Sequence, residues 1–128
     1  MELIQSNELP APAGHYSHAV ATRAGLVFVS GILPARDRVA PGAPFETQCA
    51  SVFDQCAKVL RAAGCGFGDV VQCTAYLAGV EYWPAFNTAY AAVFAGHKPA
   101  RAVVPVPSLH HDYLVELQLV AERPGAQS

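Results

Sequence analysis

Apolar residues change their spacing several times along this chain, and the order of these changes most constrains its fold. Two segments, residues 45–64 and 81–96, carry apolar residues at the spacing of one helical face. The remaining apolar segments alternate or run together as strands do, over residues 17–25, 26–34, 69–79, 98–107 and 113–122. The predicted order is ββαβαββ, which favours an α+β fold with a mixed β-sheet and both helices on one face.

The other face of such a sheet has no helix to cover it, and the composition indicates that a partner does. Charged residues make up 14% of the 128 residues and hydrophobic residues 52%, whereas about 25% charged residues is typical. So few charges do not easily cover the surface of a small monomer. We therefore expect an oligomer, with a very apolar monomer as the alternative. The length suits one domain spanning residues 1–128.

The net charge and the cysteines indicate which classes of partner and which cellular compartment to expect. The formal net charge of −2 gives no field that would attract a nucleic acid or an anionic membrane. The apolar runs are too short to cross a bilayer, and the first ten residues lack the basic start of a secretory signal. The four cysteines show no C-x-x-C spacing and lie in apolar segments, as reduced packing residues do. We expect a cytoplasmic protein without nucleic-acid or membrane partners.

Two charged residues stand inside apolar strand patterns. Arg101 precedes a run of valines between two prolines, and Glu116 interrupts the stretch YLVELQLV. A short loop around Ser108 separates the two segments, so an antiparallel hairpin would place Arg101 and Glu116 roughly opposite each other. The two residues then form either a structural ion pair or part of a pocket in which unused guanidinium donors bind a ligand carboxylate.

Three further residues are candidates for a binding site. The spacing places Asn87 on the apolar stripe of the second helix, where a buried amide needs partners, either a nearby loop or a ligand. Ser30 and Gly31 stand at the end of an apolar strand. A glycine there permits a bulge or the close approach of a ligand to the backbone, with a plain strand end as the simpler alternative.

The histidines, serines and glycines predict no metal, serine-hydrolase or phosphate site. His15 and His18 would point to opposite faces of a strand, and His110 and His111 are neighbours in a loop, so neither pair suits zinc. The serines lack a G-x-S-x-G context. The stretch AAGCGFGD follows a helix and precedes a strand, which is the wrong order for a phosphate loop. We therefore expect no metal and no cofactor.

Taken together, these segments resemble the RidA family, the reactive intermediate (enamine/imine) deaminases, also known as YjgF-type proteins. The resemblance runs from Ala13 to Glu122 and rests on GHYSHAV, LVFVSGILP, the long stretch from QCASVFDQC to FNTAY, KPARAVV and LVELQLVA, in that order. It implies a chorismate-mutase-like homotrimer with a ligand cleft at each subunit interface. Deaminases of the family hydrolyse 2-iminopropanoate and related imines, which arise from 2-aminoacrylate, to 2-keto acids and ammonia. They use no cofactor.

The resemblance also implies roles for single residues. Arg101 matches the arginine that clamps the substrate carboxylate, and Glu116 matches the glutamate that handles the water. The pocket-lining positions match Tyr16, Ser30, Gly31, Asn87 and, through its backbone carbonyl, Val103. Chemically, an imino acid needs its carboxylate oriented, a base for the attacking water and an acid for the departing ammonia. The direction of the pKa shift at Glu116 is open, because burial would raise it and Arg101 would lower it.

The chain departs from the family pattern at several positions. His15 stands where proline is usual, Ile32 replaces a common glutamine, and Ala102 and Val103 replace a frequent Ser-Cys pair. These changes leave anion binding intact and bear on the substrate range. A non-catalytic trimer that binds small carboxylates or regulates is the alternative function. Ribonuclease activity, an older label for the family, is disfavoured by the acidic balance and by the lack of a basic stripe.

Overall fold

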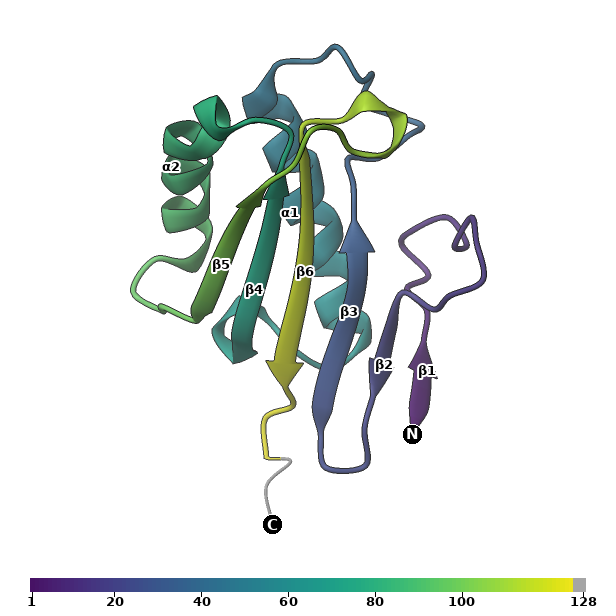
Figure 1. Ribbon diagram of the computed structural model, residues 1–128. Helices are drawn as coiled ribbons and strands as arrows, with labels where there is room; N and C mark the ends of the chain where they lie inside the picture. The colour runs from purple at the N-terminus through teal and green to yellow at the C-terminus, as the bar shows by residue number, and fades with distance from the viewer. Residues whose placement is uncertain (126–128) are drawn as a thin grey trace.

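The computed structural model describes residues 1–125, which contain one six-stranded sheet and two helices (Figure 1). The strands lie in the order β1-β2-β3-β6-β4-β5, and all neighbours are antiparallel except β4 and β5. Their bounds are Glu2–Ile4 (β1), Ala19–Ala21 (β2), Leu26–Ile32 (β3), Val70–Leu77 (β4), Ala100–Pro105 (β5) and Val115–Glu122 (β6). The predicted α+β class is confirmed. β1 was not predicted, and the strand expected over residues 17–25 is limited to β2.

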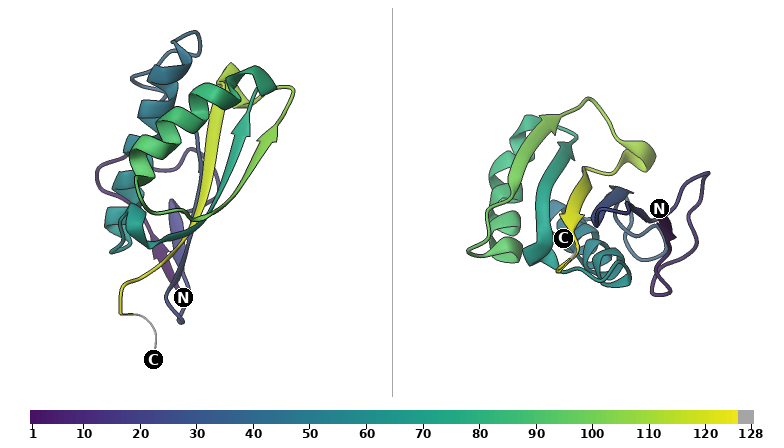
Figure 2. Two further views of the ribbon diagram at one scale, coloured as in Figure 1. Left: turned by 90° about the vertical axis from the view of Figure 1, so that its left-hand side faces the viewer. Right: turned by 90° about the horizontal axis from the view of Figure 1, so that it is seen from below.

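Helices α1 (Phe45–Ala62) and α2 (Trp83–Phe94) pack on the same face of the sheet (Figure 2, left). The predicted spacing places Val52, Cys56 and Leu60 of α1 in the core, each at most 1% exposed. The helix ends where predicted, because Gly64 adopts a φ of +80°. That left-handed turn lets the Cys65 N–H donate to the Leu60 carbonyl at 2.8 Å.

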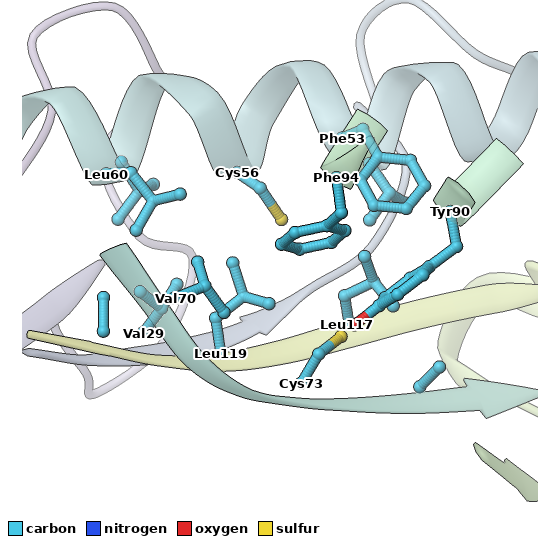
Figure 3. Packing of buried hydrophobic residues seen from close by; sticks show 14 of the residues in the cluster. Val29, Phe53, Cys56, Leu60, Val70, Cys73, Tyr90, Phe94, Leu117 and Leu119 are labelled. Carbon is cyan, nitrogen blue, oxygen red and sulfur yellow. The ribbon is translucent and has the colours of Figure 1, made fainter. Parts of the chain in front are cut away.

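The core fills the space between the two helices and the sheet. Phe53 of α1 and Tyr90 and Phe94 of α2 pack over Leu117 and Leu119 of β6 (Figure 3). Residues of β6 alternate as predicted, with every second side chain buried against the helices. Glu116 therefore lies on the face without helices.

The predicted hairpin between the strands of Arg101 and Glu116 is wrong. β4 lies between β5 and β6, pairing parallel with β5 and antiparallel with β6. The physical reason is that β4, α2 and β5 form a βαβ crossover, which returns the chain parallel to its start. β5 is an edge strand with an exposed Arg101, not a core strand. Its flanking prolines, Pro99, Pro105 and Pro107, suit an edge because proline cannot donate to a neighbour.

The sheet face opposite the helices is apolar over much of its area. Leu3, Phe28 and Val104 are 70%, 47% and 37% exposed there. Phe28 is aligned with Val20 of β2 and Val120 of β6, so these three side chains share this face. Such a surface is typical of an interface between protein subunits.

Candidate active site

Arg101 is held by α2 on the helix-covered side of β5. Its Nη1 donates a hydrogen bond of 2.9 Å to Oδ1 of Asn87, and its guanidinium carbon lies 4.8 Å from the centre of the Tyr90 ring. Its remaining N–H groups find no acceptor within residues 1–125. The guanidinium is therefore oriented by one hydrogen bond and one cation–π contact, with donors left for an anion.

Asn87 is exposed, so its predicted place on the buried stripe of α2 is wrong. The buried stripe of α2 is narrower than expected and consists of Phe86, Tyr90 and Phe94. Within residues 1–125, the side-chain amide of Asn87 does not bond to a nearby loop. Its oxygen accepts the hydrogen bond from Arg101. Asn87 thus acts as a positioning residue for the guanidinium.

Two further neighbours of Arg101 complete this edge of the sheet. Cys73 of β4 is aligned with Arg101, and burial raises the pKa of its thiol to about 12, so the thiol stays protonated and is a poor nucleophile. Val103 is aligned with Ala75 on the same side of β5 and is half-buried. Arg101 and Val103 thus lie on one face of one strand.

Glu116 lies in a separate cavity on the opposite face. This cavity of about 330 Å³ is lined by Gly31, Tyr76, Leu109, Glu116 and Gln118. The carboxyl group is half-buried, and desolvation raises its pKa, while nearby His110 partly opposes the shift. Of the two opposing influences expected from the sequence, burial prevails. A raised pKa makes a carboxylate a better proton acceptor and its acid a usable donor near neutral pH.

Ser30 and Gly31 form an irregularity in β3 that fits around Glu116. The pairing of β3 with β6 shifts register between Val29 and Ile32, so the strand is irregular at the glycine and does not simply end there, which was the simpler alternative. A Cβ atom at Gly31 would overlap Oε2 of Glu116, so a larger residue there would force the carboxyl end of the Glu116 side chain to move. The Ser30 hydroxyl donates to the Ser17 carbonyl at 2.6 Å, and its N–H donates to the His18 carbonyl at 3.0 Å.

A larger cavity of about 560 Å³ lies beside the first. Tyr16, 53% exposed, stands at its rim, and Ser30 and Ile32 line it from β3. The N-terminal loop over residues 9–14 and the segment 33–37 supply much of the wall. The sequence analysis did not assign either segment to the site, although the prolines of LPAPAG and ILPAR signal ordered loops there.

His110 and His111 also line this larger cavity and were not predicted to belong to a binding site. Their rings are tilted against each other by 39°, with centres 3.7 Å apart. His111 and Asp112 both adopt left-handed backbone conformations, with φ of 61° and 63°. Two consecutive non-glycine residues in this region are costly, and such strain is concentrated at functional sites.

One chain does not bring all predicted site residues together. Arg101 is aligned with Cys73 and contacts α2, whereas Glu116 is aligned with Tyr76 on the uncovered face. The β4 residues aligned with them, Cys73 and Tyr76, are three residues apart along that strand. Because β4 lies between β5 and β6, two strand spacings separate the strand of Arg101 from the strand of Glu116. This corresponds to roughly 10 Å along the strands and roughly 10 Å across them. A small ligand cannot contact both groups of the same chain.

Residues 1–125 contain no group of three His, Cys, Asp or Glu side chains that could hold a metal ion. Within the same range, no helix is long and apolar enough to span a membrane.

Comparison with known proteins identifies the family. Residues 6–123 match the family described as Endoribonuclease L-PSP. The chain belongs to the RidA family. A RutC family protein from Synechocystis is 34% identical over 97% of this chain and 98% of its own length. The goat protein named 2-iminobutanoate/2-iminopropanoate deaminase is 33% identical over 93% of this chain and 88% of its own.

Solved structures of the RidA family share the fold. The crystal structure of RidA from an Antarctic Psychrobacter superposes with a TM-score of 0.87 at 28% identity, covering 95% of this chain and 99% of the other. The predicted family is therefore confirmed, and several family members carry the name of imine deaminases.

Proposed function

We propose that this protein hydrolyses 2-imino acids, formed from reactive enamines, to 2-keto acids and ammonia. The observation that carries the proposal is the pair of half-sites formed by Arg101 and Glu116. Arg101 has oriented but unused donors for a carboxylate, and Glu116 is a half-buried carboxyl group beside a cavity. Relatives named as imine deaminases support the same chemistry.

The proposed reaction needs only these two groups and water. Arg101 binds the substrate carboxylate through two parallel N–H groups and so fixes the position of the adjacent C=N carbon. Glu116 accepts a proton from water as the oxygen adds to that carbon. Glu116 passes this proton to the imine nitrogen, which gives a carbinolamine. Glu116 then accepts the hydroxyl proton as the carbonyl forms and delivers it to the amine as the C–N bond breaks, so that ammonia leaves and Glu116 is again a carboxylate.

Because one chain separates Arg101 from Glu116, we propose that the site forms between two copies in a homotrimer. The edge strand β5 of one copy would carry Arg101 to the uncovered face of the next, where Glu116 lies. The apolar side chains of that face support such an interface. The proposed partners are thus the carboxylate-bearing imine and two further copies of the chain.

Mixed trimers test the shared site directly. Arg101→Ala and Glu116→Gln are each expected to abolish activity alone. Random co-assembly of equal amounts makes each variant occupy half of the positions, so about one interface in four joins an intact Arg101 to an intact Glu116. We expect about a quarter of wild-type activity in the mixture. No recovery in verified mixed trimers would contradict a shared site.

The activity itself is measured as imine hydrolysis in competition with semicarbazide, using imines made from amino acids by an amino acid oxidase. Tight binding of 2-keto acids without any turnover would favour the non-catalytic binding protein instead. We further propose a cytoplasmic location, which the four buried, free thiols support.

A further inference from the structure

The two cavities described above lie next to each other. Ser30 lines the larger cavity and Gly31 the smaller, while His110 lines the larger and Leu109 the smaller. Neighbouring residues are 3.8 Å apart at Cα. His110, a lining residue of the larger cavity, also lies close enough to Glu116 for its charge to lower the pKa of that carboxyl group, so the larger cavity begins near Glu116.

The wall of the larger cavity is mainly apolar. Leu9, Ile32, Leu33 and Val59 belong to its wall. The cavity's volume of about 560 Å³ falls in the range of small-molecule sites and far exceeds the volume of one methyl group.

The polar groups deep in this wall already have partners within the protein. His18 uses both ring nitrogens, with Nδ1 accepting from the Ser6 N–H at 2.9 Å and Nε2 paired with the Pro10 carbonyl at 3.1 Å. The Gln55 amide donates to the Leu33 carbonyl at 2.6 Å. A polar ligand group entering here would lose its hydrogen bonds to water without forming new ones to these side chains, which are already paired.

The charged side chains of the cavity stand at its exposed rim. Arg36 and Asp37 are adjacent, exposed and opposite in sign, so they offer no net charge to a ligand. Desolvation, Arg36 and His110 together lower the pKa of His111. This shift, partly opposed by Asp112, favours the uncharged form of the His111 ring.

We propose that the larger cavity receives the side chain of the substrate, so that the protein prefers 2-imino acids with branched aliphatic or aromatic side chains over 2-iminopropanoate. The inference rests on the proposed function, since the carboxylate would be held by Arg101 and the reacting carbon by Glu116. It adds a substrate class that follows from the cavity's size, apolar wall and satisfied polar groups.

Binding of the product 2-keto acids tests the inference without requiring turnover. Calorimetry would compare pyruvate, 4-methyl-2-oxopentanoate and phenylpyruvate. We expect the larger two to bind at least about tenfold more tightly than pyruvate, because each buried carbon adds to the affinity of an apolar pocket. Equal or tighter binding of pyruvate, or no binding of any of the three, would overturn the inference.

Two variants place the preference in the cavity. Ile32→Gln makes its wall polar, and Ala13→Trp fills the cavity from an exposed loop, where loss of folding is not expected. Each should reduce the preference for the larger 2-keto acids over pyruvate to below about threefold. Val80→Gln, an exposed apolar-to-amide change far from the cavity, is the matched control. A preference that survives both cavity variants would contradict the proposed location.

Hydrolysis rates separate this inference from the proposed function. Imines from leucine and phenylalanine should be hydrolysed with higher kcat/KM than the imine from alanine. If no imine is hydrolysed but the affinities show the expected order, the deaminase proposal fails and the cavity assignment stands. If all imines are hydrolysed equally and affinities do not differ, the function stands and the cavity assignment fails.

Discussion

Replacing Arg101 with lysine separates a carboxylate clamp from a solvated charge. Arginine presents a planar fork of donors, here oriented by Asn87 at 2.9 Å and by the Tyr90 ring at 4.8 Å. Lysine keeps the charge but offers a single point donor on a flexible stem. A charge-assisted hydrogen bond contributes about 1.5–3 kcal/mol, and the cation–π contact about 0.5–1 kcal/mol at an exposed site.

The sum predicts a loss of roughly 2–4 kcal/mol of transition-state stabilisation, or about 30- to 1000-fold in kcat/KM. Stability should fall by less than about 1 kcal/mol, because Arg101 is exposed and makes no ion pair within residues 1–125. The assay is imine hydrolysis together with thermal unfolding. Arg23→Lys, in the exposed turn before β3, is the matched control. Activity of Arg101→Lys within about threefold of wild type, or its unfolding, would refute the clamp.

Three further predictions follow from the site. Glu116→Gln should keep 2-keto acid affinity in calorimetry but lose turnover; near-normal turnover would reduce Glu116 to a structural role. The same variant should unfold at a higher temperature than wild type at pH 7, with the difference shrinking in acid. A folded-state pKa raised by burial means that stability is lost as pH rises through it, so an unchanged difference across pH would contradict the shift. Gly31→Ala should lower kcat by at least about tenfold, since its Cβ would displace the Glu116 carboxyl; Gly42→Ala, with open space around it, is the control.

The parts of the fold that sequence predicts are those set by local periodicity. The face of α1 that carries Val52 and Cys56 is buried as its spacing requires, and the alternation in β6 correctly separates Glu116 from Leu117. These predictions succeed because side chains in a regular element repeat with a fixed period. The burial of one residue therefore indicates the burial of the others on the same face. β1 escapes prediction because three residues are too few to show a period, and only its pairing with β2 makes it a strand.

The arrangement of the strands depends on long-range pairing and is harder to predict. A short loop between two strands usually indicates a hairpin, yet the segment between β5 and β6 crosses the end of β4 instead. Two hydrogen bonds fix this crossing: the Val106 N–H donates to the Leu77 carbonyl at 2.8 Å, and the Ala78 N–H donates to the Leu114 carbonyl at 3.0 Å. The prolines of β5 are the one sequence signal that marks it as an edge strand.

The same topology is the reason why we propose a site shared between two copies of the chain. A hairpin would have joined Arg101 to Glu116 as neighbours, and their charges would then satisfy each other. With β4 inserted, neither charge neutralises the other: desolvation raises the pKa of Glu116 with no contribution from Arg101, and the guanidinium keeps unused donors. A carboxylate-bearing substrate would supply the missing anion for Arg101, while Glu116 keeps the raised pKa that proton transfer needs. In the proposed trimer, residues kept apart within one chain would meet between two chains, so an arginine and a glutamate could both face one small molecule without first pairing with each other.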